Sequence, residues 1–220
     1  MNFEAARANM VDNQIRTTDV TSHSVLTAFL AVPREAFVPE KSKALSYIDR
    51  DVEICPAVDG KVARYLMQPS PLAKLLQLAA VTKEDAVLEI GAGTGYVSAL
   101  LSLLAGSVVA VEEDEALAAE AKANLAGYAN VSVVAGSFSA GNTAGAPYDL
   151  IFVSGAVEEV PASLLSQLRD GGRLVTVQGY GNSARATVFV AERGAVSENV
   201  FFNASVKPIA GFAKVREFVF

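Results

Sequence analysis

The sequence predicts an α/β protein built on a doubly wound, mostly parallel β-sheet, and three observations lead to this prediction. First, five short apolar stretches between residues 86 and 177 alternate with helix-like segments. This alternation is typical of βαβ units, whose strands are buried on both faces. Second, a glycine-rich loop, "GAGTG" (91–95), follows the first of these stretches. Third, residues 185–220 alternate between apolar and polar, which predicts antiparallel strands at one edge.

The individual elements follow from local pattern. The parallel strands are expected at "AVLEI" (86–90), "SVVAV" (107–111), "VSVVA" (131–135), "DLIFV" (149–153) and "GRLVTV" (172–177). Helices are expected between them, over residues 96–104, 114–127 and 160–171. The antiparallel edge strands are expected at 185–194, 196–204 and 212–220.

The N-terminal part predicts a helical cap. Helices are expected over residues 2–16, 21–33 and 70–81. The second begins at Ser/Thr capping candidates and turns Val25, Leu26, Phe29 and Leu30 inward. Near residue 80 the pattern changes from successive helices to alternating strands and helices. We therefore expect a cap and substrate-side segment over 1–80 and a Rossmann-like, nucleotide-binding core over 81–220. We expect the two to form one compact unit.

Composition narrows the possible chemistry. The chain has one cysteine, Cys55, and one histidine, His23, which excludes an internal disulfide and a multi-cysteine zinc site, and no ligand cluster suggests a metal. Cys55 is expected to be a buried apolar group, and His23 an exposed or capping residue. Residues 1–80 carry nine basic and nine acidic residues, and residues 81–220 carry nine and fifteen. This acidic balance disfavours nucleic-acid binding. No transmembrane segment or signal peptide is evident, so a cytoplasmic location is expected.

The glycine loop discriminates between nucleotide ligands. A dinucleotide site reads GxGxxG and would need glycine at position 96, where this chain has Tyr96. The preceding Glu89 is unhelpful beside a pyrophosphate but favourable near a cation. Glu112, at the end of the second strand, is placed to accept hydrogen bonds from ribose hydroxyls. S-adenosylmethionine carries a ribose and a positive sulfonium, so it is favoured over NAD.

These residues resemble those of class I S-adenosylmethionine-dependent methyltransferases. The resemblance implies that Gly91, Gly93 and Gly95 approach the methionine part of the cofactor and that Glu112 holds its ribose. The family's aspartate that contacts the adenine amine corresponds to Ser137, a weaker acceptor.

Further segments resemble the protein-L-isoaspartate O-methyltransferases over nearly the whole chain. They are "MVDNQIR" (10–16), "VPREAFVP" (32–39), "YIDRDVEI" (47–54), "MQPS" (67–70), the region from 148 to 175 and the terminal "VREFVF" (215–220). The resemblance implies methyl transfer to the carboxylate of an L-isoaspartyl residue in a damaged protein, whose ester then cyclises to a succinimide. A carboxylate is ionised at neutral pH and needs no general base.

The substrate side departs from that family. Its Ser-Gln-Pro motif reads Met67-Gln68-Pro69 here, and methionine cannot donate a hydrogen bond. Ser70, Arg64 or Tyr65 could supply the missing contact, or Arg64 could be an ordinary exposed loop arginine. The family's threonine after the fourth strand is Ser154, a mild change.

Three other functions stay open. A related methyltransferase would use a different acceptor. A binding protein would hold the cofactor without turnover. An NAD-linked oxidoreductase is disfavoured by Tyr96, and nucleic-acid methylation by the absence of an Asn/Asp-Pro-Pro-Tyr motif, since "VSGAV" (153–157) stands in the corresponding place.

Overall fold

A seven-stranded sheet forms the centre of the molecule. The computed structural model describes residues 1–58 and 62–214. The strand order is β5-β4-β3-β6-β7-β8-β9. The bounds are β3 (Ala86–Ile90), β4 (Ser107–Glu112), β5 (Val131–Ala135), β6 (Tyr148–Val157), β7 (Leu168–Gln178), β8 (Arg185–Glu192) and β9 (Ala195–Asn203). The strands from β5 to β7 pair in parallel, whereas β8 and β9 are antiparallel. The fold class expected from the sequence is therefore confirmed.

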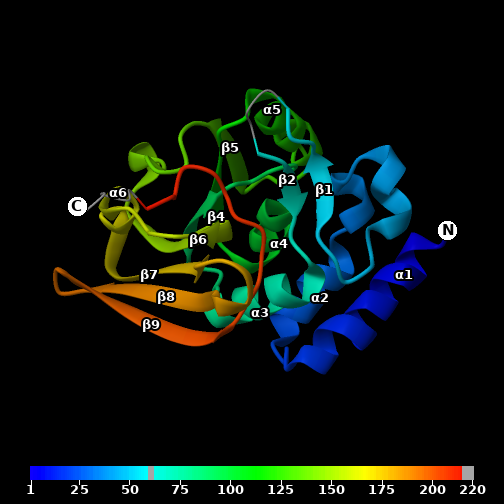
Figure 1. Ribbon diagram of the computed structural model, residues 1–220, viewed down its shortest axis with the longest axis horizontal. Helices are drawn as coiled ribbons and strands as arrows, with labels where there is room; N and C mark the ends of the chain where they lie inside the picture. Colours follow the sequence, from blue (N-terminus) through cyan, green and yellow to red (C-terminus); the bar gives the residue numbers. More distant parts are fainter. Residues whose placement is uncertain (59–61, 215–220) are drawn as a thin grey trace, which may run out of the picture.

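Among the described residues, five helices pack into the core on one face of this sheet, and one short helix packs into the core on the other. The described residues form α1 (Phe3–Met10), α2 (His23–Ala31), α3 (Pro69–Ala79), α4 (Tyr96–Leu104), α5 (Glu115–Asn124) and the short α6 (Ala162–Leu165). A π-helical turn over Val11–Ile15 and short 3₁₀ turns continue the N-terminal helices. In Figure 1 the blue N-terminal helices lie to one side of the sheet, and the orange β8 and β9 form the edge away from α5.

The alternation of side chains along the central strands sorts the core into two layers. In β3 and β6, Val87, Leu150 and Phe152 pack with the N-terminal helices and α4. Their neighbours in sequence belong to a second cluster on the other face: Leu88, Ile90, Ile151 and Val153. Successive strand residues point to opposite faces, so this division is what the strand period of two requires.

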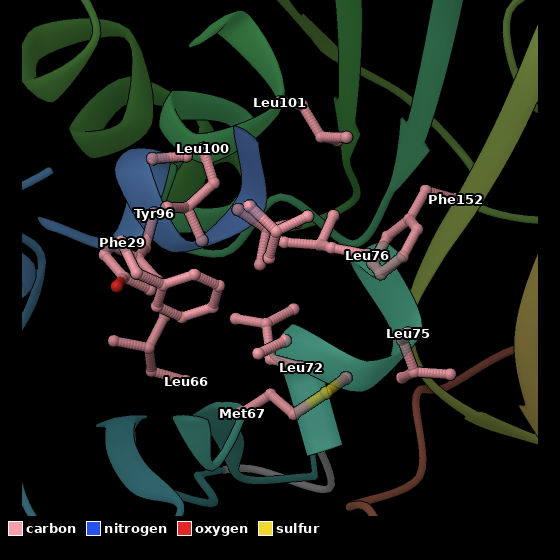
Figure 2. Close-up of a cluster of buried hydrophobic side chains, with 14 of the residues drawn as sticks. Phe29, Leu66, Met67, Leu72, Leu75, Leu76, Tyr96, Leu100, Leu101 and Phe152 are labelled. Carbon is pink, nitrogen blue, oxygen red and sulfur yellow. The ribbon is translucent and has the colours of Figure 1, made fainter. Parts of the chain in front are cut away.

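The N-terminal helices share one apolar core with the sheet. Figure 2 shows Phe29 of α2, Leu72 and Leu76 of α3, and Tyr96 and Leu100 of α4 in one buried cluster. This packing accounts for the helical pattern of the first 80 residues, although the proposed division at residue 80 stays a prediction.

A two-stranded antiparallel hairpin, β1 (Val52–Cys55) and β2 (Arg64–Leu66), stands apart from the main sheet. Residues of its two strands and their connection line a cleft together with residues that follow the carboxyl ends of β4 and β5. Ligands of open α/β sheets bind at this edge of the sheet. No helix among the residues described is long and apolar enough to cross a membrane.

Four expectations about elements are corrected. Residues 160–171 form only the four-residue α6, because Leu168 already begins β7. Leu30 is 40% exposed instead of inward, since α2 buries Val25, Leu26, Ala28 and Phe29. Residues 212–214 are not in a strand, and the rest of that expected strand, 215–220, lies outside the described residues. Cys55 is half-buried rather than buried and lines the cleft.

Candidate functional site

A cleft lies between the β1–β2 hairpin and the carboxyl ends of β4 and β5. Its volume is about 880 Å³, within the range of small-molecule sites. Of the residues predicted to hold the cofactor, the exposed Ser137 lines it directly. The other lining residues come from the hairpin, the start of α5, the end of β5 with the loop after it, and the segment after β9: Cys55, Pro56, Val58, Val62, Arg64, Glu113, Asp114, Glu115, Ala116, Ala135, Gly136, Phe138 and Ala210.

Glu112 lies at the last position of β4, with its carboxylate fully buried. Its Oε2 accepts a 2.8 Å hydrogen bond from the backbone N–H of Gly93. Its Oε1 accepts a 3.1 Å bond from the N–H of Asp114, the N-cap residue of α5. The glycine loop and the acidic residue, 19 positions apart, are therefore brought together as the sequence predicts.

The glycine loop between β3 and α4 needs its glycines for backbone conformation and for space. Gly91 has φ +88°, and a Cβ added there would lie 2.3 Å from Cδ1 of Ile209. Gly93 has φ +56°, and a Cβ there would lie 2.7 Å from Cδ1 of Ile54. L-residues with side chains rarely adopt these angles. Gly95, φ +98°, precedes the first residue of α4 and packs against Leu125.

The loop and Glu112 do not line the open cleft. Ile54 of β1 and Ile209 lie against Gly93 and Gly91, and Arg64 of β2 pairs with Glu112 through two bonds of 2.6 and 2.9 Å. Arg64 is thus neither an exposed loop arginine nor free for a substrate in this state, because its side chain is only 14% exposed and engaged. These three side chains separate the loop from the cleft.

A second, much smaller pocket, of about 10 Å³, shares Arg64 with the cleft. Its lining comes from the residues before β1, from β2 and the residue after it, from β6 and from the segment after β9: Asp51, Arg64, Tyr65, Met67, Ser154, Lys207, Pro208 and Ile209. The segment that carries Lys207 is anchored to β6, because the N–H of Ala156 donates to the carbonyl of Lys207 at 2.9 Å. The N–H of Ile209 donates back to the carbonyl of Ala156 at 3.0 Å. We call this the acceptor pocket, after the role that we propose for it.

The residues of the "MQPS" motif (67–70) differ in what they contact. Met67 lines the acceptor pocket, but its side chain also belongs to the apolar cluster of Figure 2. The N–H of Gln68, the N-cap of α3, donates to Asp51. The Ser70 hydroxyl donates to Asp49 at 2.7 Å and to the carbonyl of Gln14 at 3.0 Å. Ser70 therefore fixes the start of α3 instead of replacing the missing serine hydroxyl in the pocket.

Glu89 lies beneath the acceptor pocket and is fully buried. The hydroxyls of Ser98 and Ser154 donate to its two oxygens at 2.5 and 2.8 Å. Burial, the largest effect, raises the pKa of Glu89 to about 7, and the nearby charge of Glu112 adds to this, while the two hydroxyl bonds and Arg64 oppose it. Ser154, a substrate-side candidate, is thus tied to Glu89, a cofactor-side candidate.

The raised pKa of Glu89 makes a prediction about stability. The native state binds this proton more tightly than the unfolded chain, so the contribution of Glu89 is present below pH 4.5 and is lost as the pH rises toward 7. The free energy of unfolding of the wild type should fall relative to that of Glu89→Gln by about 2–3 kcal/mol between pH 4.5 and 8. Urea unfolding of both proteins across this range tests it, and parallel pH profiles would contradict it.

Four residues of the site were not predicted, because no local sequence pattern distinguishes them. Lys207 places its ammonium 5.2 Å from the ring centre of Tyr65 in the acceptor pocket. Phe138 presents its ring to Arg64, and Asp49 holds the start of α3. The fully buried Arg34 donates to the carbonyls of Ser46 and Met67, each at 2.8 Å. Arg34 stands within "VPREAFVP" (32–39), and only a search for buried charges could have singled it out.

Known proteins resemble this chain over most of its length. The family model described as Protein-L-isoaspartate(D-aspartate) O-methyltransferase matches residues 5–206. A protein-L-isoaspartate O-methyltransferase of Koribacter versatilis is 38% identical over 175 residues, covering 79% of this chain and 76% of that protein. Protein-L-isoaspartate O-methyltransferase 1 of Rhodopseudomonas palustris is 41% identical over 188 residues, covering 84% and 74%.

Solved structures show the same fold. A protein-L-isoaspartate O-methyltransferase superposes with a TM-score of 0.79 at 29% identity, over 93% of this chain and 66% of that chain. A Plasmodium falciparum protein, a putative member in complex with S-adenosyl-L-homocysteine, gives 0.75 at 17% identity over 94% and 98%, a likeness of fold alone. The resemblance read from the sequence is confirmed. The chain belongs to the protein-L-isoaspartate(D-aspartate) O-methyltransferase family, whose members are S-adenosylmethionine-dependent O-methyltransferases of the class I fold.

Proposed function

We propose that this chain transfers a methyl group from S-adenosylmethionine to the free carboxylate of an L-isoaspartyl or D-aspartyl residue in a damaged protein or peptide. The observation that carries the proposal is the contiguity of three parts. The cleft beside Ser137, the buried Glu112 with its glycine loop, and a pocket lined by the cationic Arg64 and Lys207 follow one another along one edge of the sheet.

The residues present fit the cofactor. Glu112 supplies a buried carboxylate whose partner, Arg64, is a side chain that can move away. In this assignment Glu112 binds the ribose, and Gly91, Gly93 and Gly95 let the methionine part approach the backbone. Ser137 faces the adenine, and Glu89 lies near the cationic sulfur. The side chains of Ile54, Ile209 and Arg64 lie against Gly93, Gly91 and Glu112, so in this assignment they make room for the cofactor.

The chemistry requires little from the protein beyond position. The cofactor, when bound, supplies a methyl group activated by a positively charged sulfur. An acceptor carboxylate is already ionised at neutral pH, so a chain with one histidine and one cysteine is sufficient. The acceptor pocket, about 10 Å³ in this state, has to widen to admit the carboxylate, orient one of its oxygens and exclude water. Ile209 and Met67, both buried, provide the apolar wall that excludes water.

Transfer of a labelled methyl group from S-adenosylmethionine to an L-isoaspartyl peptide tests the proposal. We expect base-labile label on this peptide and none on the same peptide with ordinary aspartate. Label on neither peptide, from folded protein that binds S-adenosylhomocysteine, would contradict the isoaspartyl acceptor and favour a different methyl acceptor or a binding role. Failure to bind S-adenosylhomocysteine at millimolar concentration would contradict the cofactor assignment itself.

For other methyl acceptors and for the cellular location, the argument rests on the sequence alone. The excess of acidic over basic residues in 81–220 disfavours a nucleic-acid acceptor. The expected cytoplasmic location is a prediction consistent with repair of intracellular proteins.

A further inference from the structure

Arg64 connects the two halves of the site. Among the described residues it is the only one that lines both the cleft and the acceptor pocket. Its guanidinium binds both oxygens of Glu112, with Nη1 to Oε1 at 2.6 Å and Nη2 to Oε2 at 2.9 Å. The other side of the guanidinium lies near the ring of Phe138, with Cζ 5.1 Å from the ring centre. Arg64 therefore lies across the boundary between cofactor and acceptor.

The Glu112 carboxylate has no acceptor site left in this state. Each of its oxygens accepts one backbone N–H, from Asp114 or Gly93, and one N–H of Arg64. A carboxylate offers about four lone-pair sites, so these four bonds saturate it. The backbone donors are fixed by the loop and by α5. Two ribose hydroxyls can bind Glu112 only at the two positions that Arg64 now occupies.

The acceptor pocket, in turn, offers a carboxylate few neutral side-chain donors, because besides Ser154 only Tyr65 of its lining carries a hydroxyl. Met67 has no hydrogen to donate. The Ser154 hydroxyl is directed to Glu89 at 2.8 Å. The cations of the lining are Arg64 and the exposed Lys207, whose ammonium lies over the Tyr65 ring. A guanidinium matches the planar geometry of a carboxylate with two parallel bonds, whereas an ammonium is a point charge.

We propose that Arg64 is a substrate-binding residue that exchanges one carboxylate for another. In the ligand-free chain it binds Glu112, and when the ribose takes Glu112 it turns into the acceptor pocket and orients the carboxylate to be methylated. This inference rests on the proposed function. It explains how the chain dispenses with a hydroxyl at position 67, and it makes the two ligands cooperative, because the cofactor releases the group that the acceptor needs.

Arg64→Met tests the exchange, since methionine keeps much of the aliphatic part of the side chain and removes the charged guanidinium. We expect S-adenosylhomocysteine, measured by calorimetric titration, to bind about tenfold more tightly, because no ion pair has to be broken. The KM for an L-isoaspartyl peptide should rise about tenfold or more. Arg16→Met is the matched control, because Arg16 pairs with Asp12 on the exposed surface of the N-terminal helix. It should leave both quantities unchanged.

The sign of the change in cofactor affinity distinguishes substrate binding from support of the site. If Arg64 only holds Glu112 in place, Arg64→Met binds S-adenosylhomocysteine more weakly, and the proposal is overturned. Arg64→Lys keeps the charge and the fold but loses the guanidinium, which can form two parallel bonds to a carboxylate. It should therefore give intermediate values of the S-adenosylhomocysteine dissociation constant and of the peptide KM. An Arg64→Lys protein with unchanged peptide KM would also count against the exchange.

The wild-type protein provides a test that needs no variant. Saturating S-adenosylhomocysteine should tighten binding of the isoaspartyl peptide about tenfold, and the peptide should tighten cofactor binding by the same factor. Independent binding of the two ligands would overturn the exchange while leaving the proposed function intact. Absence of any cofactor binding by the wild type would overturn both. Methylation of the peptide with independent binding would leave only the proposed function standing.

Discussion

Glu112→Gln is expected to weaken binding of S-adenosylmethionine on the order of 100-fold, because it removes the charge that two ribose hydroxyls would meet. Hydrogen bonds to a charged group contribute about 1.5–3 kcal/mol each, and glutamine keeps the shape of the side chain but replaces one acceptor oxygen with a donor. The expected loss comes from one buried carboxylate at the end of β4. Calorimetric titration of the folded variant measures it.

Glu120→Gln is the matched control for this prediction. Glu120 is an exposed residue of α5, and the same loss of charge there should leave cofactor affinity unchanged. Equal affinity of Glu112→Gln and the wild type would show that the ribose is held elsewhere. A weakening shared by both variants would instead indicate a general effect of net charge.

Arg34→Ala is expected to lower the free energy of unfolding by about 3 kcal/mol or more, the largest stability effect in the N-terminal part. Arg34 is fully buried, and its guanidinium carbon lies 5.0 Å from the ring centre of Tyr96. Truncation leaves the carbonyls of Ser46 and Met67 without these donors and opens a cavity beside Tyr96. Urea unfolding should show a lower midpoint with an unchanged slope.

Arg16→Ala provides the comparison for the stability measurement. Its exposed pair with Asp12 has a spacing of four residues and contributes at most a few tenths of a kcal/mol. A loss below about 1 kcal/mol for Arg34→Ala would mean that water replaces the guanidinium at both carbonyls. The same variant should also disturb the acceptor pocket, because Arg34 holds the backbone of Met67.

The sequence predicted the parts of this protein that depend on local pattern. The alternation of apolar strands and helices from β3 to β7 is visible because the central strands β3 and β6 are buried on both faces. The glycine loop is visible because the left-handed backbone at Gly91, Gly93 and Gly95 favours glycine. The prediction of a helix over 160–171 was wrong because it, too, used local pattern alone. Its apolar spacing fits a helix, but pairing with β6 draws Leu168 into the sheet.

Only the tertiary structure decided what the substrate-side residues contact. Ser70 looked available to an acceptor, but Asp49 and the carbonyl of Gln14, 21 and 56 positions away in the chain, take its hydroxyl. Leu30 matched the inward face of a helix, but the neighbours that bury α2 come from other parts of the chain. Such contacts join residues that are far apart in the sequence, so the local pattern around each residue does not predict them.

The fold class and the family were thus determined by the sequence itself, since they rest on hydrophobic period, turn conformation and motif spacing. The state of the site was decided by the tertiary structure. Arg64 and Glu112 are 48 residues apart, and Ile209 reaches Gly91 from the far end of the chain. The physical reason is that charge pairing and close packing act through space, so their partners are specified only when the hairpin and the segment after β9 lie against the glycine loop.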